Sequence, residues 1–137
     1  MKTAHLVILK RPYLAAILAG SKTVEFRLTK DRRAPFGCVK SGHTLYLKQS
    51  SGPVLATATV ARVHTEENLT PARIRELKSC YNNEIQGPDT YWAARENANY
   101  ATLIWLKDIK KIPPRTIQKT DQRPWVVLTE KENFGLL

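Results

Sequence analysis

The hydrophobic pattern changes period at Gly20, and this change constrains the fold more than any other feature of the chain. Before it, Pro12 suits the first residue of a helix, and Leu14, Ile17 and Leu18 form an apolar stripe at helical spacing. After it, residues 23–27 ("TVEFR") alternate between apolar and polar. Glycine favours the left-handed backbone that ends a helix. We therefore predict a helix over about residues 12–19, followed by a strand with its charges on one face.

The rest of the chain alternates between short apolar segments and turn signals. Further strands are predicted over residues 5–9, 44–49, 53–63, 100–109 and 123–130, and further helices over 70–81, capped by Thr70 with Pro71, and 89–97, capped by Asp89. "SSG" joins 44–49 to 53–63 as a hairpin, and residues 28–42 are predicted to form a mobile loop. This order predicts an α+β, mainly β fold: a small, mostly antiparallel barrel with helices packed outside. The 137 residues suit a single domain, residues 1–137.

The charge is strongly basic, with 22 Lys and Arg against 12 Asp and Glu and a formal net charge of +10. The excess is concentrated between Lys10 and Lys48, which hold nine basic and two acidic residues. A polyanionic partner benefits from such an excess through steering and counterion release, although a basic surface also serves solubility.

Other classes of protein lack support in the sequence. No apolar run is long enough to span a membrane and no signal peptide is evident, so we expect a cytoplasmic protein without a membrane partner. Cys38 and Cys80 are far apart and are expected to be free thiols. Because no metal, triphosphate or dinucleotide motif is present, we predict neither a metal site nor a cofactor.

Three charges follow the glycine closely. Glu25 and Arg27 are two residues apart on a strand and share a face, which Lys22 enters from the preceding turn. A lysine that is partly buried near an arginine has a lowered pKa and can act as a base, whereas a nearby carboxylate favours its ammonium form. The alternative is an ion-paired strand face with no further role.

A phenol and a cation share a second strand face. Tyr46 and Lys48 point to the same side of 44–49, and they would reach the three charges if that strand neighboured 23–27. Aromatic rings interleaved with cations suit single-stranded nucleic acid, because the rings stack on bases and the cations bind phosphates.

The stretch "GSKTVEFR" contains the pattern G-x-K-x-x-E-x-R at Gly20, Lys22, Glu25 and Arg27. On this pattern the chain resembles an ASCH domain of the PUA-like superfamily. The likeness runs from about Leu6 to Leu128 and includes the segments "LKRPYLAAIL", "TLYLKQSSGPVLATATVARV" and "YWAARENANYATLIWLKDIKKIPP". It implies a PUA-like β-barrel with a cleft beside the helix that precedes the motif, where related folds hold RNA or an extruded base.

The resemblance also implies which residues serve the cleft. Lys22, Glu25 and Arg27 would line it, Lys10, Tyr46, Lys48 and Ser50 would border it, and Trp92, Arg95 or Trp125 would close it. Some bacterial ASCH proteins resemble amidohydrolases of N4-acetylcytidine that use a lysine and a threonine three positions later, and others resemble ribonucleases. Here Glu25 occupies the position of that threonine, and a carboxylate is a poor substitute for an activated hydroxyl.

The leading hypothesis is an ASCH domain that binds RNA or a modified nucleotide, with Glu25 accepting from an exocyclic amine while Lys22 and Arg27 hold oxygens. The first alternative is a metal-independent enzyme acting on RNA or a modified nucleoside, with Lys22 and Glu25 as catalytic residues. The second alternative is a protein-interaction module. The sequence leaves all three open.

Overall fold

The computed structural model describes residues 3–137 and contains six strands and three helices. The strands are β1 (Ala4–Leu9), β2 (Val24–Thr29), β3 (Thr44–Gln49), β4 (Val54–Glu67), β5 (Tyr100–Arg115) and β6 (Trp125–Val127), and the helices are α1 (Arg11–Ala19), α2 (Pro71–Ile85) and α3 (Asp89–Ala93). Their order along the chain is the predicted one. Within the described residues, no helix is both long and apolar enough to cross a bilayer.

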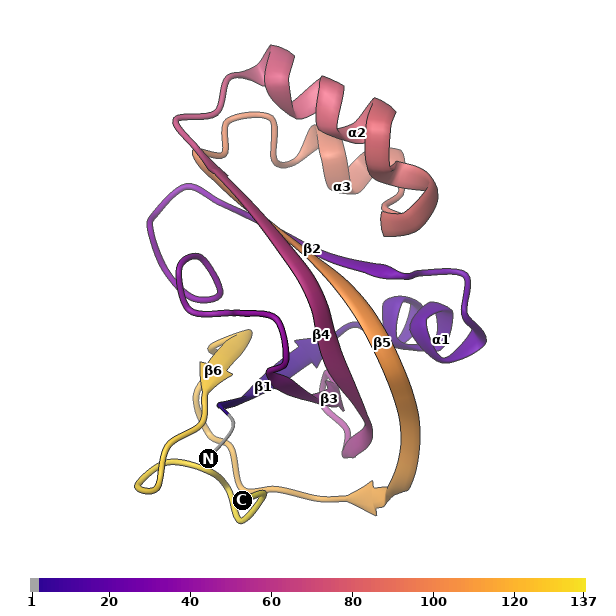
Figure 1. Ribbon diagram of the computed structural model, residues 1–137, viewed down its shortest axis with the longest axis vertical. Coiled ribbons are helices and arrows are strands. Elements are labelled where there is room, and N and C mark those ends of the chain that lie inside the picture. Colours follow the sequence, from indigo (N-terminus) through magenta and orange to yellow (C-terminus); the bar gives the residue numbers. More distant parts are fainter. Residues whose placement is uncertain (1–2) are drawn as a thin grey trace.

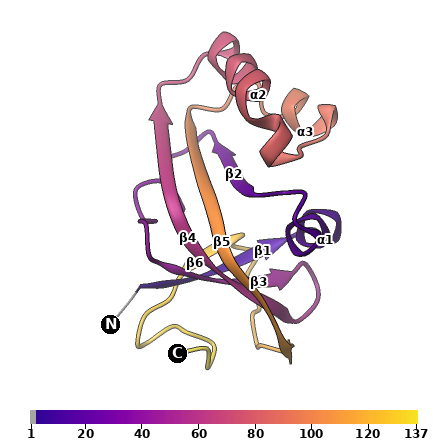
Figure 2. The same cartoon turned by 45° about the vertical axis from the view of Figure 1, so that its right-hand side comes forward.

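All six strands form one sheet in the order β2-β5-β4-β3-β1-β6. Every pairing is antiparallel except that of β1 with β3, which run parallel. The sheet curls along the long strands β4 and β5, with α2 and α3 over one end and α1 beside it (Figures 1 and 2). The predicted mainly β fold is confirmed in the form of an open half-barrel, whose edge strands are β2 and β6.

Strands β4 and β5 are longer than the sequence predicted. Their pairing slips at three points, each of which lets the strands bend. At one of them, Ala56 of β4 pairs with Lys111 and Val54 pairs with Arg115. The stretch of β5 between these two pairs is therefore longer than the stretch of β4 opposite it. Pro113 and Pro114 lie in this longer stretch, where their missing N–H groups cost no ladder hydrogen bond. Strand β5 therefore continues through the prolines to Arg115, beyond the predicted end at residue 109.

The predicted C-terminal end of α1 and the predicted start of α2 agree with the structure, whereas α2 continues to Ile85 instead of ending at residue 81. Gly20 follows α1 with φ +85°, and its N–H bonds to the Ile17 carbonyl at 3.1 Å. The Thr70 hydroxyl accepts from the Arg73 N–H at 3.1 Å and caps α2. Both helices thus begin or end at the residues whose chemistry favours it.

Two predictions near the second half of the chain are wrong. Helix α3 ends at Ala93, and Pro88 rather than Asp89 is its N-cap. The Asp89 carboxylate instead accepts from the Lys78 ammonium at 2.9 Å. The last strand covers only Trp125–Val127 instead of 123–130, because β6 pairs with β1 over just three residues.

The core consists of three apolar clusters. One packs α1 on the sheet through Leu14 and Ile17, and a second packs α2 and α3 on β2 and β5. A third lies under the C-terminal residues. Strand β1 contributes Val7 to the first cluster and Leu6 to the third, so both of its faces are buried. This explains the unbroken apolar run "HLVIL".

Candidate ligand cleft between the sheet edges

A cleft of about 940 Å³ lies where the half-barrel stays open between its edges. Edge strand β2 provides one wall, the end of β1 provides the floor, and the segment before β6 provides the opposite wall. The remaining lining comes from Tyr13 and from residues 33–35, 48–51 and 90–95. Seven basic and two acidic side chains line this seam cleft, so it favours an anionic ligand.

Arg27 bridges the gap between the two sheet edges. From β2 its guanidinium donates to the Ile8 carbonyl of β1 at 3.0 Å and to the Pro124 carbonyl before β6 at 3.4 Å. Its Nε lies 3.6 Å from Glu25 Oε1, and the guanidinium lies over the Trp125 ring at 5.3 Å. Arg27 therefore closes the sheet through its side chain, with part of its donor capacity left for a ligand.

Glu25 is a buried carboxylate with one unused oxygen. The side chain is 7% exposed, and Oε1 accepts from the Phe26 N–H at 2.9 Å. Oε2 is buried and has no hydrogen-bond partner among residues 3–137. Buried polar atoms in native proteins are nearly always paired, so this oxygen requires a donor from water or from a ligand.

Tyr91 and Arg95 form the wall contributed by α3. The Arg95 guanidinium lies 4.0 Å from the Tyr91 ring centroid and donates to the Tyr91 carbonyl at 3.2 Å. The Tyr91 hydroxyl donates to the Phe26 carbonyl at 3.3 Å, and burial raises the pKa of this phenol. The half-buried guanidinium of Arg95 thus offers a planar cation on which a base can stack.

Lys22 is buried behind the seam cleft and does not line it. Its ammonium donates to the Val24 carbonyl at 2.9 Å and to the Ile85 carbonyl at 2.6 Å. Burial lowers the pKa of this amine, the Glu25 carboxylate raises it, and the Arg27 charge lowers it further. Lys22 therefore connects the start of β2 to the end of α2 through its two hydrogen bonds.

The structure brings six of the ten predicted site residues together in the seam cleft. They are Lys10, Glu25, Arg27, Lys48, Ser50 and Arg95. Trp125 lies beneath Arg27, and Trp92 of α3 is buried in the core, where its Nε1 donates to Asn82 Oδ1. Tyr46 is separated from the motif, because β3 neighbours β4 and β1 rather than β2. Its hydroxyl donates to the Leu136 carbonyl at 3.1 Å.

Several lining residues were not predicted from the sequence. Tyr13 comes from α1, Arg33 from the loop after β2, and Lys119 and Arg123 from the segment that precedes β6. The basic composition of "QKTDQRP" is the one signal that pointed to Lys119 and Arg123. Nothing in the spacing of this segment indicates that it lies near residues 20–27, and only the folded chain shows that both line the same cleft.

Behind the seam cleft, Trp125 belongs to a buried polar network. Its Nε1 donates to His5 Nδ1 at 3.0 Å, and His5 Nε2 lies 2.9 Å from His43 Nδ1. His5 is fully buried, and burial, together with the charge of His43, lowers the pKa of His5 to about 4. The network therefore holds His5 neutral at physiological pH.

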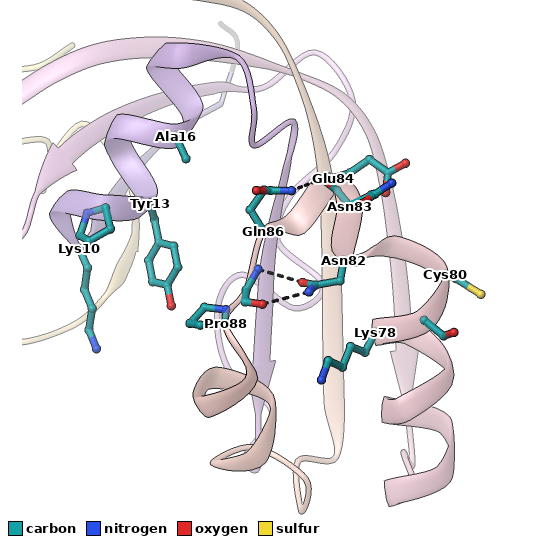
Figure 3. Close-up of a pocket in the computed structure, with 13 residues that line it drawn as sticks. Lys10, Tyr13, Ala16, Lys78, Cys80, Asn82, Asn83, Glu84, Gln86 and Pro88 are labelled. Carbon is teal, nitrogen blue, oxygen red and sulfur yellow. Dashed lines mark hydrogen bonds between the residues drawn. The ribbon is translucent and has the colours of Figure 1, made fainter.

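A second cavity of about 790 Å³ lies between α1 and the segment of α2 that leads into α3 (Figure 3). Lys10 and Tyr13 line it as well as the seam cleft, and the Tyr13 side chain points toward Pro88. Glu84 also lines this cavity, and its Oε2 is buried without a partner among the described residues. The two hollows thus meet at the first turn of α1.

No protein-family model matches the sequence, and the search of curated proteins finds no match. The structure is similar to that of ASCH from Zymomonas mobilis, with a TM-score of 0.73 and 20% sequence identity over 94% of this chain and 90% of that one. A serine-to-alanine variant and a tyrosine-to-phenylalanine variant of that protein give the same TM-score and identity, over 90% and 92% of their own chains. This chain therefore has the fold of an ASCH domain protein.

Proposed function

We propose that the chain is an ASCH domain that binds RNA or a nucleotide by accepting one base into the seam cleft. The observation that carries this proposal is the buried Glu25 Oε2, which lacks a partner within residues 3–137. A buried acceptor left unpaired costs about 1–3 kcal/mol, and more when it is charged. An N–H of a base, such as an exocyclic amine, recovers this cost on binding.

The surroundings of Glu25 suit a base. Arg95, which lies against the Tyr91 ring in the same cleft, supplies a planar cation for stacking. Cations on the cleft rim, including Lys10 and Arg33, are placed to attract phosphates. These features together support a ligand with a flat, N–H-bearing ring and negative charge.

The position of Lys22 supports binding rather than turnover. Both enzyme alternatives require a catalytic amine, but two of the Lys22 N–H donors are directed at backbone carbonyls and the residue does not line the cleft. Thr23, which precedes β2, is exposed and follows Lys22, whose side chain is buried. A binding role requires neither residue to touch the ligand.

The test is equilibrium binding of labelled single-stranded RNA and of the four ribonucleosides to wild type and Glu25→Gln. Glutamine keeps the shape but removes the charge, so we expect at least a tenfold loss of affinity for the preferred ligand. Glu67→Gln is the matched control, because the Glu67 side chain is 53% exposed and outside the cleft.

Two results would contradict the proposal. The first is absence of binding to any of these ligands at low salt. The second is equal affinity in wild type and Glu25→Gln while both variants unfold cooperatively. The recovered RNA is also inspected for cleavage, since products that disappear in Glu25→Gln would favour the enzyme alternative.

A further inference from the structure

Two lysines from distant parts of the chain lie in the rim of the seam cleft. Lys48 comes from the end of β3 and Lys119 from the segment before β6. Lys119 is unusual, because its side chain is only 5% exposed. Its ammonium donates to the carbonyl of Asp121 at 2.8 Å and to Asp121 Oδ1 at 3.0 Å. A buried lysine held in this way has a fixed position, unlike an ordinary surface lysine.

The two ammonium groups are close enough to influence each other. Burial lowers the pKa of Lys48, and the positive charge of Lys119 lowers it further. Lys48 donates to the Gln49 carbonyl at 3.2 Å, which is a neutral acceptor. No carboxylate pairs with Lys48 among residues 3–137.

The Asp121 carboxylate does not neutralise Lys119 alone, because it also pairs with Arg123. The Asp121 carboxylate accepts from the Arg123 backbone N–H at 2.9 Å and from its guanidinium at 3.0 Å. Arg123 also donates to Glu132, with its shortest distance 2.7 Å. Asp121 thus acts as a fixed anchor for Lys119, and a positive charge remains at this part of the rim.

The N–H groups of Lys48 and Lys119 that are not bonded to protein oxygens suit an oxyanion. An ammonium has three N–H donors, of which Lys119 uses two and Lys48 uses one on protein oxygens. Ser50, exposed on the same rim, adds a hydroxyl. A phosphate presents several acceptor oxygens and a charge of at least −1.

We propose that Lys48 and Lys119, with Ser50, form a phosphate subsite of the seam cleft. The cleft therefore binds a nucleotide or an RNA strand through a phosphate as well as through its base, and it discriminates against the free nucleoside. Its volume of about 940 Å³ is at the upper end for small-molecule sites and accommodates base, sugar and phosphate. This inference rests on the proposed base binding beside Glu25.

Calorimetric titration tests the subsite with the four ribonucleosides and their 5′- and 3′-monophosphates. For wild type we expect the preferred monophosphate to bind at least tenfold more tightly than its nucleoside. In Lys119→Ala and in Lys48→Gln this advantage should fall by at least fivefold. Lys48→Gln is included because Lys48 is only half-buried, so this variant is expected to fold even if Lys119→Ala does not.

Lys107→Ala is the matched control, because it removes one exposed positive charge outside the cleft. Nucleoside binding without any gain from the phosphate would overturn the subsite and leave the proposed base binding intact. A phosphate gain that persists in Lys48→Gln would also overturn it. Loss of binding for nucleosides and monophosphates alike, in folded wild type, would overturn both proposals.

Discussion

Lys22, Glu25 and Arg27 lie within six residues of one another, yet their charged groups have three different environments. Lys22 is committed to two backbone carbonyls, Arg27 bridges the sheet edges, and Glu25 retains a buried oxygen with no partner among the described residues. Lys22 and Arg27 thus use hydrogen bonds to stabilise the fold, whereas Glu25 keeps a free acceptor oxygen within the described residues. Of the three residues, only Glu25 has a buried side-chain atom without a hydrogen-bond partner within residues 3–137.

The buried His5 predicts a pH dependence of stability. Its pKa is about 4 when folded and about 6.5 when unfolded, so the unfolded chain binds more protons between these values. Stability is therefore fully present above about pH 6.5 and falls as the pH decreases. We expect the free energy of unfolding to drop by up to about 2 kcal/mol from pH 7 to pH 5, at 1.36 kcal/mol per pH unit below 6.5.

Urea denaturation at a series of pH values measures this effect. His5→Gln should lose most of the slope between pH 7 and pH 5, whatever its absolute stability. His64→Gln is the comparison variant, because His64 lies outside the network of Trp125, His5 and His43. An unchanged slope in His5→Gln would show that another group titrates.

At the scale of elements, the connection from α1 into β2 sets the geometry of the motif. Gly20 takes the left-handed conformation that ends α1, and three residues later the Thr23 N–H bonds to the Glu84 carbonyl at 2.9 Å. Lys22 adds its bond to the neighbouring Ile85 carbonyl. The end of α2, distant in sequence, therefore holds the start of β2 in place.

We expect Lys22→Met to lower the free energy of unfolding by about 2 kcal/mol or more. Methionine preserves the length and apolar contacts of the side chain but leaves the buried carbonyls of Val24 and Ile85 without their donor. Chemical denaturation gives the value, and Lys78→Met in α2, which removes an exposed pair with Asp89, should cost less. Equal stability of wild type and Lys22→Met would contradict this role.

At the scale of the whole molecule, the basic excess converges on the seam cleft. The segment from Lys10 to Lys48 contributes both of these lysines together with Arg27 and Arg33, and residues 119–123 contribute two further cations. The curl of the sheet brings these segments to one opening. The net charge of +10 is therefore distributed in a way that favours association with a polyanion.

The whole-molecule charge predicts a strong salt dependence of RNA binding. For single strands, the logarithm of the affinity falls with the logarithm of the salt concentration by about 0.7 per neutralised phosphate. If the cleft contacts three phosphates, the slope measured by fluorescence anisotropy is about −2. Binding of an uncharged nucleoside should show almost no salt dependence, and a slope near zero for RNA would argue against phosphate contacts.

The sequence by itself determined the order of helices and strands, the end of α1 at Gly20 and the cap of α2 at Thr70, because these depend on local backbone preferences and on hydrophobic period. It also indicated Glu25 and Arg27 as neighbours on one strand face, since alternation is a local property.

Only the tertiary structure decided which residues share the seam cleft. Tyr46 and Lys48 are two residues apart on one strand, yet the Tyr46 hydroxyl bonds to the Leu136 carbonyl, whereas Lys48 lines the cleft together with Lys119. The order β2-β5-β4-β3-β1-β6 and the curl of the sheet set these distances, and both depend on contacts between segments far apart in the chain. The burial of Lys22 has the same origin, because its partner at Ile85 is 63 residues away.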